Sequence, residues 1–76
     1  MKELLEMIAK SLVDDPQSVV VEQDNMEDGL LLKLSVSEDD MGKVIGKQGK
    51  RAKALRTIMK AVSIRNNTEV LVEITE

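Results

Sequence analysis

Two glycines separated by two polar residues, Gly46-Lys47-Gln48-Gly49, are the residues of this chain best suited to binding chemistry. Glycines let a ligand backbone approach the protein main chain closely. The amides at the start of a following helix can donate to phosphate, with the helix dipole behind them. Lys47 adds a positive charge beside those amides. The pattern therefore indicates a loop that binds the phosphates of a polyanion.

The charge of the chain is divided unevenly around this loop. The 76 residues carry a formal charge of −3. Residues 41–65 nevertheless have a charge of +8 with no acid, whereas the rest of the chain holds the other three bases and all 14 acids, a charge of −11. The eight bases are Lys43, Lys47, Lys50, Arg51, Lys53, Arg56, Lys60 and Arg65. Like charges without local counter-ions repel one another, so we expect this segment to bind an anionic partner.

The glycines do not match the phosphate loops of nucleotide-binding enzymes. A Walker A loop requires a glycine in place of Met41 and a serine or threonine in place of Gln48. A dinucleotide-binding loop requires Gly-x-Gly-x-x-Gly after a strand, whereas Gly42, Gly46 and Gly49 are spaced by four and three residues and follow an expected helix. Neither nucleotide-binding motif is present.

Composition narrows the function classes further. The chain has no His, Cys or Tyr to act as a base or nucleophile, so we predict that it is not an enzyme and uses no metal or cofactor. It also lacks Phe and Trp, which argues against the base-stacking platforms of RRM and OB-fold proteins. The acidic pairs and runs, Asp14-Asp15 and Glu38-Asp39-Asp40, are explained as a helix stop and a helix cap.

The length predicts one domain, residues 1–76, with a core built from 23 Leu, Val and Ile side chains. No apolar run approaches the roughly 20 residues that a membrane span needs. The N-terminal Glu3 and Glu6 are also unlike a signal peptide. We therefore expect no membrane span and a cytoplasmic location, to which a chain without cysteine is suited.

The N-terminal half predicts a helix and a β-hairpin. Residues 2–13 place Leu4, Leu5, Ile8 and Leu12 at helical spacing, and Asp14-Asp15-Pro16 ends that helix. A β-branched run, residues 19–21, begins a strand. Residues 24–29 are rich in residues typical of turns and end in Asp-Gly. In residues 30–36 apolar and other side chains alternate, which predicts a second strand with Leu31 on its outer face.

The C-terminal half predicts two helices and a last strand. Ser37 begins a short helix that runs into Gly46, and residues 50–64 form a longer one. Its apolar stripe consists of Ala52, Leu55, Ile58, Met59 and Val62. Asn66-Asn67 is a turn, and residues 70–74 alternate as a strand. The expected fold is α+β, with three helices on one face of a small three-stranded mixed sheet.

The glycine loop and the element order together resemble a known family. Gly-x-x-Gly between a short and a long helix is typical of a KH domain, and the order αββααβ resembles the type II, prokaryotic arrangement. The stretch from Glu38 to Gly49 is similar to stand-alone bacterial RNA-binding proteins of the KhpA (YlqC) family. The resemblance covers essentially all 76 residues. It implies binding of single-stranded RNA.

The resemblance also assigns roles to individual residues. Gly46, Lys47, Gln48 and Gly49 match the backbone clamp, and Ile45 matches an aliphatic position beside the groove. The predicted RNA-binding residues are Lys43, Ile45, Gly46, Lys47, Gln48, Gly49, Lys50, Arg51 and Lys53. Ala52 departs from the family pattern, which has a bulky aliphatic residue there, so the groove wall is expected to be shallower. Low sequence specificity follows, since phosphate contacts carry no base information.

Family resemblance implies partners as well as RNA. It implies an RNA chaperone that acts with a second, larger KH protein of the KhpB/Jag type, that self-associates as a homodimer, and that is linked to cell-shape control. Two other function classes remain open from the residues alone. One is a helix-turn-helix DNA-binding module, in which the glycines form an ordinary helix-to-helix turn. The other is a pure protein-interaction domain that uses Leu31 and Leu71 on the outer face of the sheet.

Overall fold

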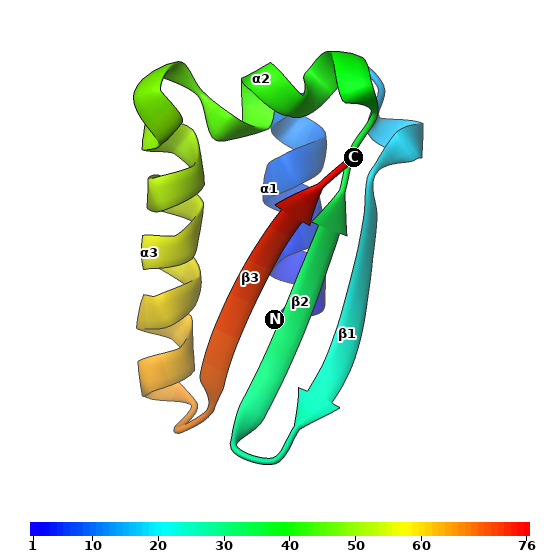
Figure 1. Cartoon of the computed structure of the whole chain (residues 1–76). Coiled ribbons are helices and arrows are strands. Elements are labelled where there is room, and N and C mark those ends of the chain that lie inside the picture. Colours follow the sequence, from blue (N-terminus) through cyan, green and yellow to red (C-terminus); the bar gives the residue numbers. More distant parts are fainter.

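The computed structural model describes residues 1–76 and has the predicted element order (Figure 1). The helices and strands are α1 (Lys2–Leu12), β1 (Val20–Met26), β2 (Gly29–Ser35), α2 (Met41–Ile45), α3 (Lys50–Arg65) and β3 (Glu69–Thr75). Three single 3₁₀ turns, Pro16–Ser18, Glu38–Asp40 and Lys47–Gly49, connect them. None of the helices has the length and hydrophobicity that a membrane crossing requires.

The sheet has the order β1-β2-β3, with β2 in the centre. β1 and β2 are antiparallel, whereas β2 and β3 are parallel, so the sheet is mixed as predicted. A parallel connection needs a crossover, and α2 with α3 supplies it. The crossover places the glycine loop between α2 and α3, above the upper end of α3 in Figure 1.

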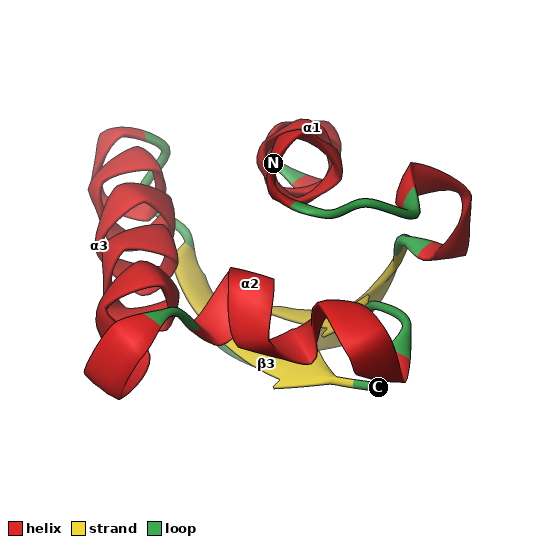
Figure 2. Ribbon diagram, turned by 90° about the horizontal axis from the view of Figure 1, so that it is seen from above, coloured by secondary structure: helices red, strands yellow, loops and turns green.

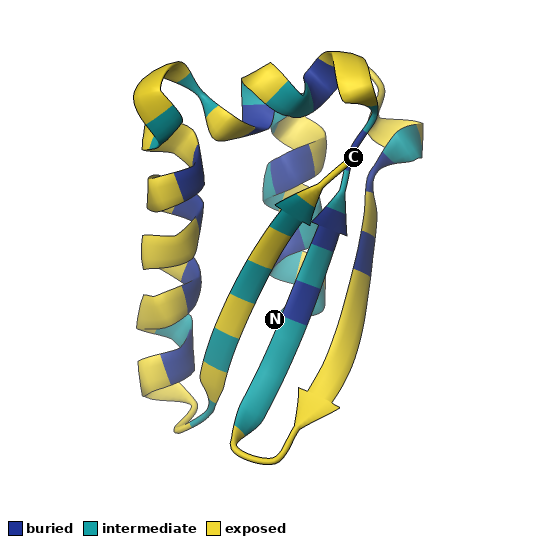
Figure 3. Ribbon diagram, viewed as in Figure 1, coloured by how far each residue is buried: buried dark blue, intermediate teal, exposed yellow.

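The helices pack on one face of the sheet and leave the other face bare. In Figure 1, α1 lies behind the strands, α3 runs along β3 and α2 spans the upper end. Figure 2 shows the same arrangement from above. Figure 3 shows buried residues on the side of α3 that is turned toward the strands and on β1 and β2. The largest fully buried ones are Leu5, Leu32, Leu34, Met59 and Val44, so every helix contributes to one aliphatic core. This two-layer packing confirms the predicted fold class.

The predicted hairpin turn was too long. Residues 24–29 were expected to turn, but β1 continues to Met26, and only Glu27 and Asp28 form the turn. Asp24 stays in the strand because it faces Leu31 across the hairpin and pairs with Lys33, at 3.1 Å between Oδ2 and Nζ. Cross-strand pairing thus overrides the turn preference of its residue type.

The predicted apolar stripe of α3 was wrong at one position. Ile58 is 43% exposed, whereas Ser63, which was not on the predicted stripe, is buried. The buried side of α3 is formed by Ala52, Leu55, Met59 and Ser63. Ser63 can be buried because its hydroxyl donates to the Lys60 carbonyl at 2.7 Å.

Candidate functional site

The glycine loop connects α2 to α3 through three residues in the left-handed region. Gly46 has φ +76°, Gln48 +58° and Gly49 +75°. The N–H of Gly46 closes α2 by donating to the Gly42 carbonyl at 2.9 Å, and the N–H of Gly49 donates to the Gly46 carbonyl at 3.2 Å. Lys47 and Gln48 are exposed between these two bonds. The loop is thus a tight turn whose two central side chains face solvent.

The two glycines are required for different reasons. A Cβ at Gly46 would lie 2.7 Å from Arg51 Cγ and 3.0 Å from the Arg51 nitrogen, so a side chain there would collide with the start of α3. A Cβ at Gly49 would meet nothing within 4 Å. Its positive φ alone favours glycine. The open space around Gly49 leaves the main chain accessible to a ligand backbone.

Arg51 lies across the inner side of the loop. Its Nη1 donates to the Lys43 carbonyl in α2 at 2.8 Å, and its stem is the group that fills the space beside Gly46. The guanidinium therefore joins the end of α2 to the start of α3. Of the predicted RNA-binding residues, Arg51 is the one whose side chain hydrogen-bonds to the main chain of α2.

Lys43 is also engaged within the protein. Its Nζ pairs with the Asp14 carboxylate and lies 3.8 Å from Asp40 Oδ1. The hydrogen bond to Asp14 is the largest cause that raises the pKa of Lys43. Figure 1 places the connection from α1 to β1, which carries Asp14, near the start of α2. Lys43 is therefore less available to a ligand than its exposed neighbours on α3.

Asp40 has a larger role than the helix cap predicted for it. Its side chain is buried, and it accepts hydrogen bonds from the N–H groups of Asp14 at 3.3 Å and Asp15 at 3.1 Å and from the Ser37 hydroxyl at 3.1 Å. Burial acts to raise the pKa of Asp40, but these donors and Lys43 together hold it below its ordinary value. The carboxylate thus ties the end of α1 to the start of α2.

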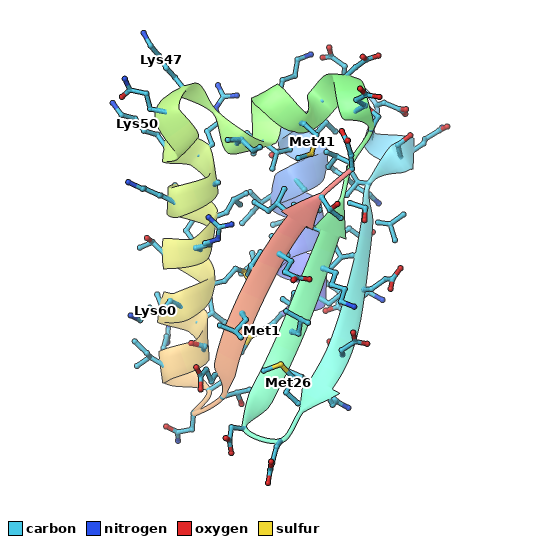
Figure 4. The ribbon with its side chains drawn as sticks, viewed as in Figure 1. Met1, Met26, Met41, Lys47, Lys50 and Lys60 are labelled. Atoms are coloured by element: carbon cyan, nitrogen blue, oxygen red, sulfur yellow. The ribbon has the colours of Figure 1, made fainter.

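Four further cations form a row on one side of α3. Lys50, Lys53, Arg56 and Lys60 follow one another at spacings of three, three and four residues, so they share one face of the helix. All four are exposed, and the ion pairs of the molecule involve other bases. Figure 4 shows Lys47, Lys50 and Lys60 along the α3 margin, away from β1. We call Lys50, Lys53, Arg56 and Lys60 the basic row.

A groove of about 720 Å³ lies between α3 and β3 beside the basic row. Arg56 and Lys60 line it from the helix, together with the apolar side chains Ile64, Val70, Leu71 and Val72. The sequence prediction placed Lys50 and Lys53 on this side of the molecule but did not include Arg56, Lys60 or Ile64 in the site. Their helical spacing from Lys53 was the signal that could have found the two bases.

Comparison with known proteins now identifies the family. The KH-domain family described as KhpA/KhpB matches residues 2–74. The chain belongs to this family. The RNA-binding protein KhpA of Clostridium perfringens is 58% identical over 97% of this chain and 99% of its own length. KhpA of Listeria monocytogenes is 49% identical over the whole of both chains, and KhpA of Chlamydia pneumoniae is 43% identical over 97% of its own length.

Solved structures confirm the KH fold. Era in complex with MgGDPNP and a segment of 16S ribosomal RNA has a TM-score of 0.65 and 21% identity, and Era of Aquifex aeolicus has the same TM-score and 22% identity. The KH chain covers 28% and 29% of those chains, and 97% of it is matched. Membership of a KH family replaces the helix-turn-helix alternative, and a KH domain is a binding module, not an enzyme.

Proposed function

We propose that this KH domain binds single-stranded RNA through the Gly46–Gly49 loop and the basic row of α3. The observation that carries the proposal is the continuity of the two features: an open loop with three left-handed residues leads directly into four exposed cations without acidic partners. Its relatives are named RNA-binding proteins, and one of the Era structures contains ribosomal RNA, which supports the same ligand class.

Low sequence specificity is part of the proposal. The exposed cations at the loop and directly after it include Lys47 and Lys50, which hold phosphates as point charges, and the chain has no aromatic ring on which a base could stack. Ala52 is buried on the inner side of α3, so no bulky residue from that position forms a groove wall. Recognition therefore depends mainly on the RNA backbone.

We propose further that the chain acts as an RNA chaperone in the cytoplasm, with a second KH protein of the KhpB/Jag type or as a homodimer. A single KH loop clamps only about four nucleotides. Linking two such clamps raises avidity without any new contact within either domain. These roles rest on the family resemblance, and partner binding would be measured by sedimentation with the second protein and with the chain alone.

The experiment that tests RNA binding replaces Lys47 and Gln48 together with Asp. Both side chains are exposed, and Asp tolerates the left-handed backbone at position 48, so the fold should be kept. We expect RNA affinity to be lost because two carboxylates would face the phosphates. A control variant, Lys10→Asp with Gln17→Asp, makes the same charge change at exposed sites outside the loop and α3. Circular dichroism checks that both variants fold.

The salt dependence of the wild-type protein gives a second readout. If about four phosphates are neutralised, log K should fall with log[salt] at a slope near −3. A duplex DNA competitor should not displace single-stranded RNA at equal concentration. Retained RNA binding in the folded double-Asp variant, or affinity that does not change with salt, would refute the proposed site.

A further inference from the structure

The sheet face opposite the helices is covered by no element of the chain. The core lies on the other face, where the helices pack, and in Figure 1 the strands lie in front of α1. Side chains alternate between the two faces of a strand, so every second residue of β1, β2 and β3 points to this bare face. The bare face is therefore open to a second molecule, and it is separate from the glycine loop and the basic row.

Exposed apolar side chains lie on the bare face. Leu31 of β2 and Leu71 of β3 are in register, and Val20 and Met26 point the same way from the two ends of β1. Val20 and Leu71 are each 48% exposed, and Met26 is 40% exposed. They are three of the seven large apolar side chains that the chain leaves exposed. Their burial would favour contact with an apolar surface of a partner.

The charges on the same face are mostly negative. Against one base, Lys33, it carries all four acids of the three strands, which are Glu22, Asp24, Glu69 and Glu73. Lys33 Nζ lies 3.1 Å from Asp24 Oδ2. This contact is the main cause that raises the pKa of Lys33, and Glu73 and Glu22 act in the same direction. One lysine leaves three of the four acids without an ion pair, so the face attracts positive charge.

The dimensions of the bare face fit a single helix. Each strand has seven residues, about 23 Å at 3.3 Å per residue, and the outer strands are about 10 Å apart. An α-helix of about 15 residues is about 23 Å long and about 10 Å wide. Rows of side chains on the sheet recur about every 6.6 Å, close to the roughly 6 Å between residues i and i+4 of a helix. Apolar residues at this spacing would therefore contact the leucines and Met26 in adjacent rows.

We propose that the bare sheet face binds a basic amphipathic helix of another protein. The apolar side chains of that helix would pack on Leu31, Leu71 and Met26, and its Lys or Arg side chains would lie beside Glu22 and Glu73. The proposal goes beyond RNA binding and does not depend on it, because none of these residues belongs to the loop or the basic row.

A second copy of this chain is a less suitable occupant. It would have to offer α3, its basic helix, and α3 would then be withdrawn from the proposed RNA binding. Such a head-to-tail contact builds rings or open filaments instead of a two-fold dimer. A different protein with a basic helix has neither restriction.

The probe for this surface is a 15-residue peptide of Leu and Lys with its leucines on one face of a helix. NMR titration of the full chain measures its affinity, and the amide shifts locate it. We expect shifts along the three strands, at Leu31 and Leu71 above all. A second peptide of the same composition, with leucines spread all around the helix, has the same charge. It should bind roughly tenfold more weakly, because it offers no continuous apolar stripe.

The apolar contact is tested by Leu71→Ser. It should weaken binding of the first peptide roughly tenfold, since the leucine would no longer be buried by the partner. The control Ile64→Ser replaces an exposed isoleucine of α3, outside the bare face, and should leave the affinity unchanged. Circular dichroism checks that both variants fold.

The charged contact is tested by Glu22→Gln with Glu73→Gln. This variant should weaken binding roughly fivefold, the effect of two exposed ion pairs. The control, Glu3→Gln with Glu38→Gln, removes the same charge at exposed sites elsewhere and should bind the peptide like the wild type.

Four results would overturn the proposal. The first is that the wild type does not bind the first peptide, and the second is that both peptides bind equally, because charge alone would then explain binding. The third is that shifts occur on the helices and not on the strands, or that each control loses as much affinity as its variant. The fourth comes from sedimentation of the protein alone. Self-association that Leu71→Ser abolishes would show that a second copy occupies the face.

Discussion

Arg51 and Lys53 are both exposed bases at the start of α3, yet the structure gives them different surroundings. Arg51 donates to the Lys43 carbonyl and fills the space beside Gly46, whereas Lys53 has no acidic partner and belongs to the basic row. Residue type alone does not separate a base that holds a loop from a base that meets a ligand. The distinction depends on where each side chain falls around the helix.

Replacement of these two residues should have different effects on the salt dependence of RNA binding. Arg51→Lys keeps the positive charge but removes the guanidinium that donates to the Lys43 carbonyl, so the loop should be less rigid. We therefore expect weaker RNA binding with an unchanged salt slope. Lys53→Ala should make the slope shallower by about 0.7, the value of one phosphate contact on a single strand. Titrations at several salt concentrations measure both. A shallower slope for Arg51→Lys would mean that Arg51 contacts phosphate directly.

From the surroundings of the Asp40 carboxylate we predict that the free energy of unfolding decreases in acid. Its pKa is lower in the folded chain than in the unfolded one, so its contribution is complete above the unfolded value, near 4, and is lost as the pH falls through the folded value. Asp40→Asn should lower the melting temperature at pH 7 and flatten its decline below pH 4. The exposed neighbour Asp39→Asn is the control and should change neither. Melting curves between pH 2 and pH 7 test this.

At the scale of elements, most of the fold was predictable because the spacing of the apolar residues and the positions of the Gly, Pro and turn residues indicate the same helices and strands. α1 ends at Leu12, shortly before Asp14-Asp15-Pro16, β2 spans Gly29–Ser35, and Gly46 follows the last residue of α2, all close to the predicted bounds. The predicted mixed sheet of three strands is also present, and the structure adds the strand order β1-β2-β3. Two details depended on tertiary packing, which a local pattern does not contain. Asp24 belongs to β1, where it pairs with Lys33, and Ser63 is buried whereas Ile58 is partly exposed.

The site was predictable only in part for the same reason. The loop itself is encoded locally, by two glycines and the polar pair between them. The engagement of Lys43 with Asp14 joins residues 29 positions apart and could not be found without the fold. The groove between α3 and β3 likewise exists only once the crossover has placed the two elements side by side.

The burial of Met59 and Ile58 on α3 predicts different losses of unfolding free energy when each is replaced. Met59 is fully buried in the core, whereas Ile58 is partly exposed. Met59→Ala should therefore cost about 2–5 kcal/mol of unfolding free energy, and Ile58→Ala less than about 1 kcal/mol. Urea denaturation of the two variants measures the difference. Equal losses would show that Ile58 belongs to the core after all.

For the whole molecule, the two faces of the sheet have separate properties. The face covered by α1 and α3 holds the core, and the bare face pairs Leu31 with Leu71, which is 48% exposed. Glu22, Asp24 and Glu73 share that outer face in register with Lys33 and Leu31. Leu31 and Leu71 are the residues that the interaction-domain prediction named. Binding of a partner protein at this face therefore stays a prediction. The acidic surround makes it a poor surface for RNA.

This separation of charge has a consequence for the kinetics of binding. α3 carries six of the eleven bases and no acid, whereas the bare sheet face carries the acids Glu22, Asp24 and Glu73, so the molecule has a permanent electric dipole. The field of a nucleic acid exerts a torque on such a dipole and turns α3 forward before the first contact. Stopped-flow measurements should therefore show the association rate falling with salt more steeply than the dissociation rate rises. On the proposed binding mode, the acidic face would thus speed up association although it lies outside the binding site.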